Sequence, residues 1–120
     1  MNRIAIDLDD RDDIKEFKAR LKRYGRLLPP VREVIVEESE KGYHVLFLTA
    51  DHDPRLNLAL RLLLYDDLKH VLYDLDAVIN NLRFPTNVLF TEKRYASRSY
   101  REVFRGSLDE LRRWLDEGLE

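Results

Sequence analysis

Two aspartates stand where the first predicted strand of this chain ends. Asp7 and Asp9 belong to and follow the alternating apolar segment 3–8, and side chains two positions apart on a strand point to the same face. Their Cα atoms would lie about 7 Å apart, so both carboxylates can bind one hard cation such as Mg²⁺ or Mn²⁺. The alternative interpretation is that the aspartates end the strand and cap the next helix, a role that suits short acidic side chains.

A histidine and a lysine follow at the start of the third predicted strand, in the segment 41–44 (Lys-Gly-Tyr-His). His44 has the opposite strand parity to positions 43, 45 and 47, so it shares the open face with Asp7 and Asp9 if those positions face the core. There it can donate a hydrogen bond to a phosphate, and Lys41 adds a positive charge. The alternative is a partly buried histidine, or one at the edge of the sheet.

Two leucines share the predicted open face with these polar residues. Leu46 and Leu48 share the strand parity of His44, and leucines also favour burial. They therefore need a cover, which is either the C-terminal helix or a second chain. The second option predicts a homodimer, or another protein interaction, through the open sheet face.

The order of these motifs resembles the archaeo-eukaryotic primase and primase-polymerase superfamily. Asp-Leu-Asp at 7–9 follows an apolar strand and Gly-Tyr-His comes later at 42–44, like the first two motifs of that family, and the resemblance spans residues 4–76. It implies an RRM-like sheet, a metal-binding acidic pair and a histidine that contacts nucleotide phosphate. The catalytic residues that it implies are Asp7, Asp9 and Asp74, the last of which lies in a predicted helix where the family has a strand.

Basic and aromatic residues alternate between positions 92 and 105. Side chains of these two kinds hold phosphates and stack on bases, so the stretch predicts a nucleic-acid-binding surface. The alternative is a docking segment whose rings pack on the domain while its arginines stay in solvent. The residues concerned are Lys93, Arg94, Tyr95, Arg98, Tyr100, Arg101 and Arg105.

Another histidine has acidic residues at helical spacing. His70 lies four positions after Asp66, three after Asp67 and four before Asp74, so all four side chains can gather on one helix face. A metal site built on one helix needs further ligands. An exposed face with salt bridges is therefore the preferred interpretation.

The elements that must position these residues follow the order β-α-β-β-α-β and then α. The sequence predicts strands at 3–8, 31–38, 43–50 and 87–91, and helices at 13–24, at 54–82 with an interruption at 65–67, and at 107–115. This order predicts an α+β, ferredoxin-like fold, with an antiparallel sheet, helices on one face and an additional C-terminal helix. The segment 92–106 is compatible with strand, loop or helix.

The length and composition of the chain narrow the classes of protein to which it can belong. With 120 residues we expect one domain over 1–120, with its core in 3–91 and a C-terminal extension in 92–120. The absence of cysteine excludes disulfides and thiolate metal sites and favours an intracellular, cytoplasmic protein. No apolar run is long enough for a membrane span, and no signal peptide is visible. Charged residues make up 37%, which is typical of a thermophilic source.

The sequence predicts a nucleic-acid-associated domain of an archaeal mobile element or virus. Its core would be a reduced primase-polymerase palm with metal-dependent nucleotide chemistry and Mg²⁺ or Mn²⁺ as the cofactor. The net charge of −2 provides no general attraction to nucleic acid. Whether the chain is an enzyme therefore stays open, and the alternatives are a non-catalytic nucleic-acid-binding module or an oligomerisation module.

Overall fold

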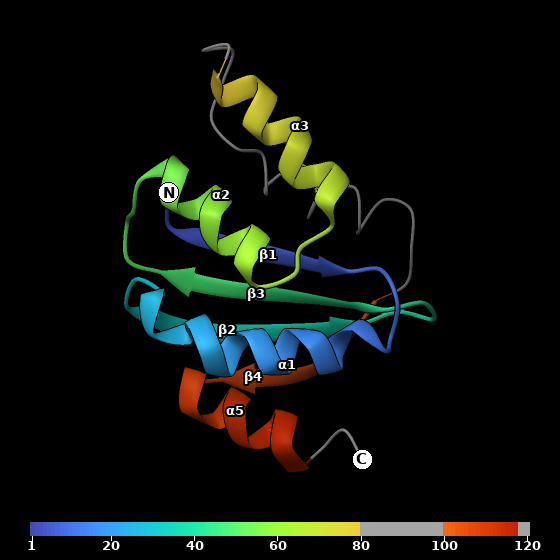
Figure 1. Cartoon of the computed structure of the whole chain (residues 1–120). Coiled ribbons are helices and arrows are strands. Elements are labelled where there is room, and N and C mark those ends of the chain that lie inside the picture. The colour runs from blue at the N-terminus through green and yellow to red at the C-terminus, as the bar shows by residue number, and fades with distance from the viewer. Residues whose placement is uncertain (80–99, 118–120) are drawn as a thin grey trace.

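The computed structural model describes residues 1–79 and 100–117, which form an α+β domain around one antiparallel sheet of four strands (Figure 1). In chain order the described elements are β1 (Arg3–Leu8), α1 (Asp13–Tyr24), the 3₁₀ turn η1 (Gly25–Leu27), β2 (Val31–Glu38), β3 (Tyr43–Thr49), α2 (Pro54–Leu63), α3 (Leu68–Ile79), β4 (Arg101–Gly106) and α5 (Leu108–Glu117). The predicted break in the second helical region is confirmed, because α2 ends before residue 65 and α3 begins after residue 67.

The strands are arranged in the order β1-β3-β2-β4, and each neighbouring pair is antiparallel. The α+β class and the antiparallel sheet are therefore as predicted, but the ferredoxin-like order is not confirmed. A ferredoxin-like sheet would place its last strand beside β1, whereas β4 lies beside β2. The strand expected at 87–91 falls outside the described residues. The C-terminal part of the segment left open by the sequence, 101–106, is strand.

Side chains from α2 and from the loop after it contact the outer edge of β1. The side-chain amide nitrogen of Asn57 donates to Arg3 O at 2.8 Å, and the backbone N–H of Asp7 donates to the Asp66 carboxylate at 2.7 Å. These two hydrogen bonds hold α2 and the loop after it against β1.

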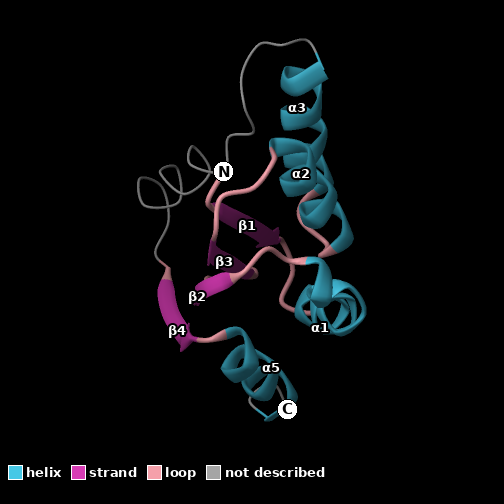
Figure 2. Ribbon diagram, turned by 90° about the vertical axis from the view of Figure 1, so that its left-hand side faces the viewer, coloured by secondary structure: helices cyan, strands magenta, loops and turns pink. Residues whose placement is uncertain are grey.

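The hydrophobic core lies between the sheet and the helices α1, α2 and α5, all on one face of the sheet (Figure 2). Its buried members come from the strands and from these helices: Ile4, Ile6, Leu8, Ile14, Phe17, Leu21, Val34, Val36, Tyr43, Val45, Phe47, Leu60, Leu64, Leu111 and Leu115. The helix α5 begins with a capping box, since Ser107 and Glu110 bond each other's backbone N–H at 2.9 and 3.1 Å. None of the helices described here is both long and apolar enough to cross a membrane.

The suggested cover of the open face by the C-terminal helix is wrong. Leu111 and Leu115 of α5 pack into the core with α1, so the helix lies on the opposite face of the sheet from Leu46 and Leu48. The amphipathic pattern of α5 required an apolar surface to pack on. The core formed by β2 and α1 provides that surface.

Gly42 brings the beginning of β3 close to the end of β1. A Cβ atom at this position would lie 1.8 Å from the carbonyl oxygen of Leu8 and 2.9 Å from the carbonyl carbon of Asp9. Both contacts are with backbone, which cannot move aside without breaking the pairing of Leu8 with Tyr43. Only glycine permits this close approach.

Gly42→Ala should therefore lower the free energy of unfolding by about 1–3 kcal/mol, the usual range for an overpacked site. Urea denaturation measures this difference. The matched control is Gly25→Ala, whose added methyl would meet no backbone atom but the end of the Arg112 side chain at 2.8 Å and Cδ1 of Leu21 at 3.4 Å. Equal stability of the Gly42→Ala variant and the wild type would show that the β1–β3 junction tolerates a side chain.

Candidate metal centre

The open face of the sheet carries a cross-strand pair of Asp7 and His44. The two residues stand opposite each other in the β1–β3 register, and Nε2 of His44 lies 3.0 Å from Oδ1 of Asp7. Tyr43 and Val45 point into the core, so the predicted parity of His44 is confirmed. His44 is 7% exposed, because the ring of Tyr100 stacks on it with a centroid distance of 4.3 Å.

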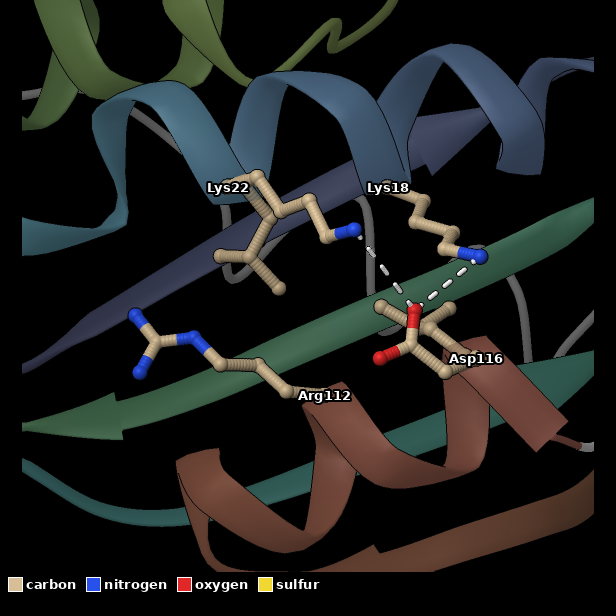
Figure 3. Close-up of a pocket in the computed structure, with 6 residues that line it drawn as sticks. Lys18, Lys22, Arg112 and Asp116 are labelled. Atoms are coloured by element: carbon tan, nitrogen blue, oxygen red, sulfur yellow. Dashed lines mark ion pairs between the residues drawn. The ribbon is translucent and has the colours of Figure 1, made fainter.

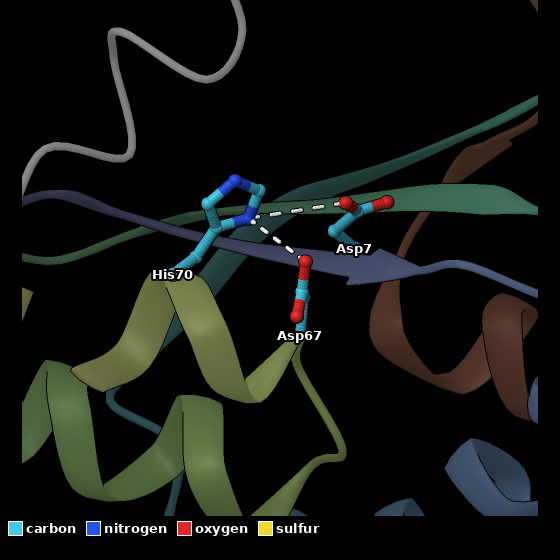
Figure 4. A group of neighbouring side chains, drawn as sticks. All are labelled: Asp7, Asp67 and His70. Carbon is cyan, nitrogen blue, oxygen red and sulfur yellow. Dashed lines mark ion pairs between the residues drawn. The ribbon is translucent and has the colours of Figure 1, made fainter. Parts of the chain in front are cut away.

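The second oxygen of Asp7 faces two residues from the N-terminal turn of α3 (Figure 4). Oδ2 of Asp7 lies 3.9 Å from Nδ1 of His70, and Oδ2 of Asp67 lies 3.6 Å from the same nitrogen. One potential ligand atom from each of Asp7, Asp67 and His70 lies within 4.8 Å of the other two. All three side chains are partly buried, so each can reach both the protein and a ligand from solvent.

This set of donors can hold a divalent cation. Carboxylate oxygens suit Mg²⁺, Ca²⁺ and Mn²⁺, whereas an imidazole nitrogen suits transition metals. A mixed set of two carboxylates and one imidazole therefore favours Mn²⁺ over Mg²⁺. His44 would not be a direct ligand, because its Nε2 holds the other oxygen of Asp7. It would instead fix the direction in which Asp7 presents Oδ2, as residues behind metal ligands commonly do.

The carboxylate of Asp66 holds the two acidic ligand residues together. One oxygen of Asp66 accepts the backbone N–H of Asp7 at 2.7 Å and that of Asp67 at 2.9 Å. The other oxygen accepts Nε of Arg61 at 2.7 Å, and the Arg61 side chain is 1% exposed. Burial raises the pKa of the Asp66 carboxyl, and the positive charge of Arg61 opposes that rise.

The end of α2 aims Asp66 at β1. The N–H of Asp66 bonds the carbonyl of Arg61 at 2.9 Å, and the N–H of Tyr65 bonds that of Leu62 at 3.3 Å, which is the pattern of a Schellman motif. Tyr65 occupies the left-handed position with φ of 78°, where glycine is usual. Arg20 lies over the Tyr65 ring at 4.8 Å, so the strained tyrosine also joins α1 to this turn.

Asp9 lies at the exposed margin of the cluster. Its pKa is raised from 3.8 to about 6 by desolvation, by the negative charges of Asp7 and Asp67, and by a side-chain hydrogen bond with Asp7. The carboxyl groups of Asp7 and Asp9 therefore interact, while the cluster of potential ligand atoms is formed by Asp7, Asp67 and His70. A cation at this position would remove the mutual repulsion that raises this pKa.

The structure does not bring Asp74 to this cluster. Asp74 is 2% exposed, and its Oδ2 accepts Nη1 of Arg61 at 2.7 Å. It therefore neutralises the second end of the buried guanidinium, and the third acidic position near Asp7 belongs to Asp67. Lys41 is exposed in the turn between β2 and β3.

The predicted nucleic-acid-binding stretch is only partly described. Lys93, Arg94, Tyr95 and Arg98 lie outside the described residues. Tyr100 packs on His44, which agrees with the docking interpretation of the aromatic rings. Arg101 pairs with Glu38, and Arg105 pairs with Glu33 and Glu102, both at 2.7 Å. In β4 the arginine charges are therefore balanced by glutamates of β2 and of β4 itself.

Asp67 and His70 were not predicted as ligands together with Asp7. Their helical spacing was visible in the sequence, but a site on one helix lacked further ligands. The missing partner was the open-face aspartate on β1, separated from Asp67 by 59 intervening positions and brought near only by the hydrogen bonds of Asp66. The two adjacent aspartates in the break between the helices, Asp66 and Asp67, were the one signal that could have indicated it.

Replacing Arg61 tests the buried ion pair. Arg61→Met leaves Asp66 and Asp74 buried without their cation, so the free energy of unfolding should fall by about 3–5 kcal/mol at pH 7. The loss should shrink at low pH, where the two carboxyl groups can enter the folded state protonated. Arg55→Met on the same helix is the control, because Arg55 is 82% exposed in its pair with Asp53. Similar losses for the two variants would contradict the importance of the buried pair.

Asp9→Asn tests the crowding of the carboxyl groups. The folded state raises the pKa of Asp9 from 3.8 to about 6, so this group favours folding less as the pH rises through that interval. The variant should be more stable than wild type at pH 7.5, by about 1 kcal/mol or less because Asp9 is exposed. The two proteins should be equally stable near pH 3.5. Glu40→Gln, at an exposed hairpin position, is the control, and a pH-independent effect of Asp9→Asn would contradict the crowding.

No protein-family model, curated protein or solved structure matched the chain.

Proposed function

We propose that this chain is a nucleic-acid-associated domain that binds a divalent cation and, through it, the phosphate of a nucleotide or a nucleic-acid strand. The observation that carries the proposal is the convergence of ligand atoms from Asp7, Asp67 and His70 within 4.8 Å. Two of these side chains are acidic, and a third carboxyl group, that of Asp9, lies beside them. A cation is the simplest partner for such a concentration of negative charge.

Each residue of this site would have a distinct role. Asp7, Asp67 and His70 would hold the cation, and His44 would orient Asp7 through the contact of 3.0 Å. Asp66 and Arg61 would keep the two acidic ligands at a fixed separation. A bound cation supplies charge neutralisation and polarisation of a phosphoryl oxygen. The exposed side of Asp9 faces the solvent from which a phosphate would approach.

Only part of the resemblance to primase-polymerases supports this proposal. Asp7 and His44 contact each other, but Asp74 pairs with Arg61 and does not join them. The histidine contacts Asp7 instead of being exposed for a phosphate. Metal-dependent nucleotide chemistry is therefore proposed from the cluster as it stands, with Asp67 and His70 in place of Asp74.

Manganese titration tests the cation. Calorimetry on the wild type should show one saturable Mn²⁺ site, with weaker binding of Mg²⁺ because of the imidazole ligand. Asp7→Asn and Asp67→Asn should each abolish binding, and His44→Gln should weaken it by about tenfold through the orientation of Asp7. Glu40→Gln should bind as wild type does. Absence of heat at millimolar Mn²⁺, or equal binding by the Asp67→Asn variant, would contradict the site.

Fluorescence anisotropy with a labelled single-stranded oligonucleotide tests the phosphate ligand. Binding should require Mn²⁺ and should be lost on chelation and in Asp67→Asn. Binding that is the same with and without Mn²⁺ would instead favour the non-catalytic module of the basic and aromatic stretch. In that case Arg101→Ala should weaken binding, and the affinity should fall steeply with salt.

A further inference from the structure

A small cavity lies between α1 and α5, on the opposite face of the sheet from the candidate metal centre (Figure 3). Its volume is about 90 Å³. Three cationic side chains, one carboxylate and two leucines line it: Lys18, Lys22, Arg112, Asp116, Leu21 and Leu115. The leucines belong to the core, so the cavity has an apolar floor and a charged rim.

The rim carries more positive than negative charge. Figure 3 shows Lys18 and Lys22 extending from α1 toward Asp116 of α5, with Arg112 one helical turn before Asp116. Nζ of Lys18 lies 3.0 Å and Nζ of Lys22 lies 3.9 Å from the same oxygen of Asp116. These contacts lower the pKa of the Asp116 carboxyl, chiefly through the hydrogen bond from Lys18. One carboxylate is thus shared by two ammonium groups.

Arg112 adds a third charge that Asp116 does not neutralise. Its Nη1 lies 3.4 Å from Asp109, at the outer side of α5, where the Asp109 side chain is 85% exposed. Its Nη2 lies against Gly25 at the end of α1, where even a Cβ atom would come within 2.8 Å. The missing side chain of Gly25 therefore leaves room for the guanidinium beside the end of α1.

We propose that this cavity binds a small oxyanion with a short apolar chain, a phosphate monoester or a carboxylate. The anionic group would contact Lys18, Lys22 and Arg112, and the chain would lie on Leu21 and Leu115. The small volume of the cavity limits the size of the ligand's apolar part, because a cavity that binds benzene has a volume of about 150 Å³. Asp116 acts as an internal counter-ion that such a ligand must compete with. This inference is independent of the proposed metal centre.

Chemical-shift titration by NMR, in the presence of a chelator, tests the proposal on the full chain. The probes are ethyl phosphate, propionate and the neutral 1-propanol. Ethyl phosphate should bind more tightly than propionate because it carries nearly two charges at pH 7.5, and 1-propanol should not bind. Propionate binding as tightly as ethyl phosphate would identify the carboxylate as the natural class.

Three variants locate the binding. Lys18→Gln and Arg112→Gln should each weaken ethyl phosphate binding at least fivefold, whereas Asp116→Asn should tighten it by removing the competing carboxylate. Arg23→Gln is the control, since Arg23 is an exposed cation of the same helix that does not line the cavity. Unchanged affinity in Asp116→Asn, equal weakening by Arg23→Gln, or binding of 1-propanol would overturn the proposal. Because the chelator removes divalent cations, these outcomes do not depend on the metal centre.

Discussion

A buried guanidinium between two carboxylates is the interaction on which the rest of this structure depends. Arg61 bonds Asp66 and Asp74, each at 2.7 Å, in surroundings that exclude solvent from all three side chains. Charges in such a place are costly unless they are fully paired. The pairing fixes where α2 ends, where α3 begins and how both approach β1. It therefore helps to position Asp67 and His70 relative to Asp7.

The same region also contacts one edge of the sheet. Asp66 and Asn57 satisfy backbone groups along the outer edge of β1, and this edge would receive the last strand in a ferredoxin-like order. The described last strand, β4, pairs with β2 instead. The hydrogen bonds of Asp66 also place the helical turn with Asp67 and His70 beside Asp7.

The two faces of the sheet differ in charge. The open face gathers the carboxyl groups of Asp7, Asp9 and Asp67, and their crowding raises the pKa of Asp9 to about 6. The helical face gathers Lys18, Lys22 and Arg112 around one aspartate. The small overall charge of −2 conceals this separation, because positive and negative clusters cancel in the sum. The two proposed binding sites, one for a cation and one for an anion, therefore lie on opposite sides of the sheet.

The local pattern of apolar and polar residues in the sequence was enough to predict most helices and strands and the faces that they bury. Alternation assigned Ile4 and Ile6 to the core, and the parity of His44 followed from its buried neighbours, because side-chain direction repeats within a few residues. The partners of Asp7 and the role of Asp74 were decided only by the tertiary structure. Arg61 carries no sequence signal of burial, yet its charge takes Asp74 away from the cluster and Asp66 brings Asp67 toward it. Such pairings join residues far apart in the chain, and the free energy that selects them arises only when folding removes the charges from water.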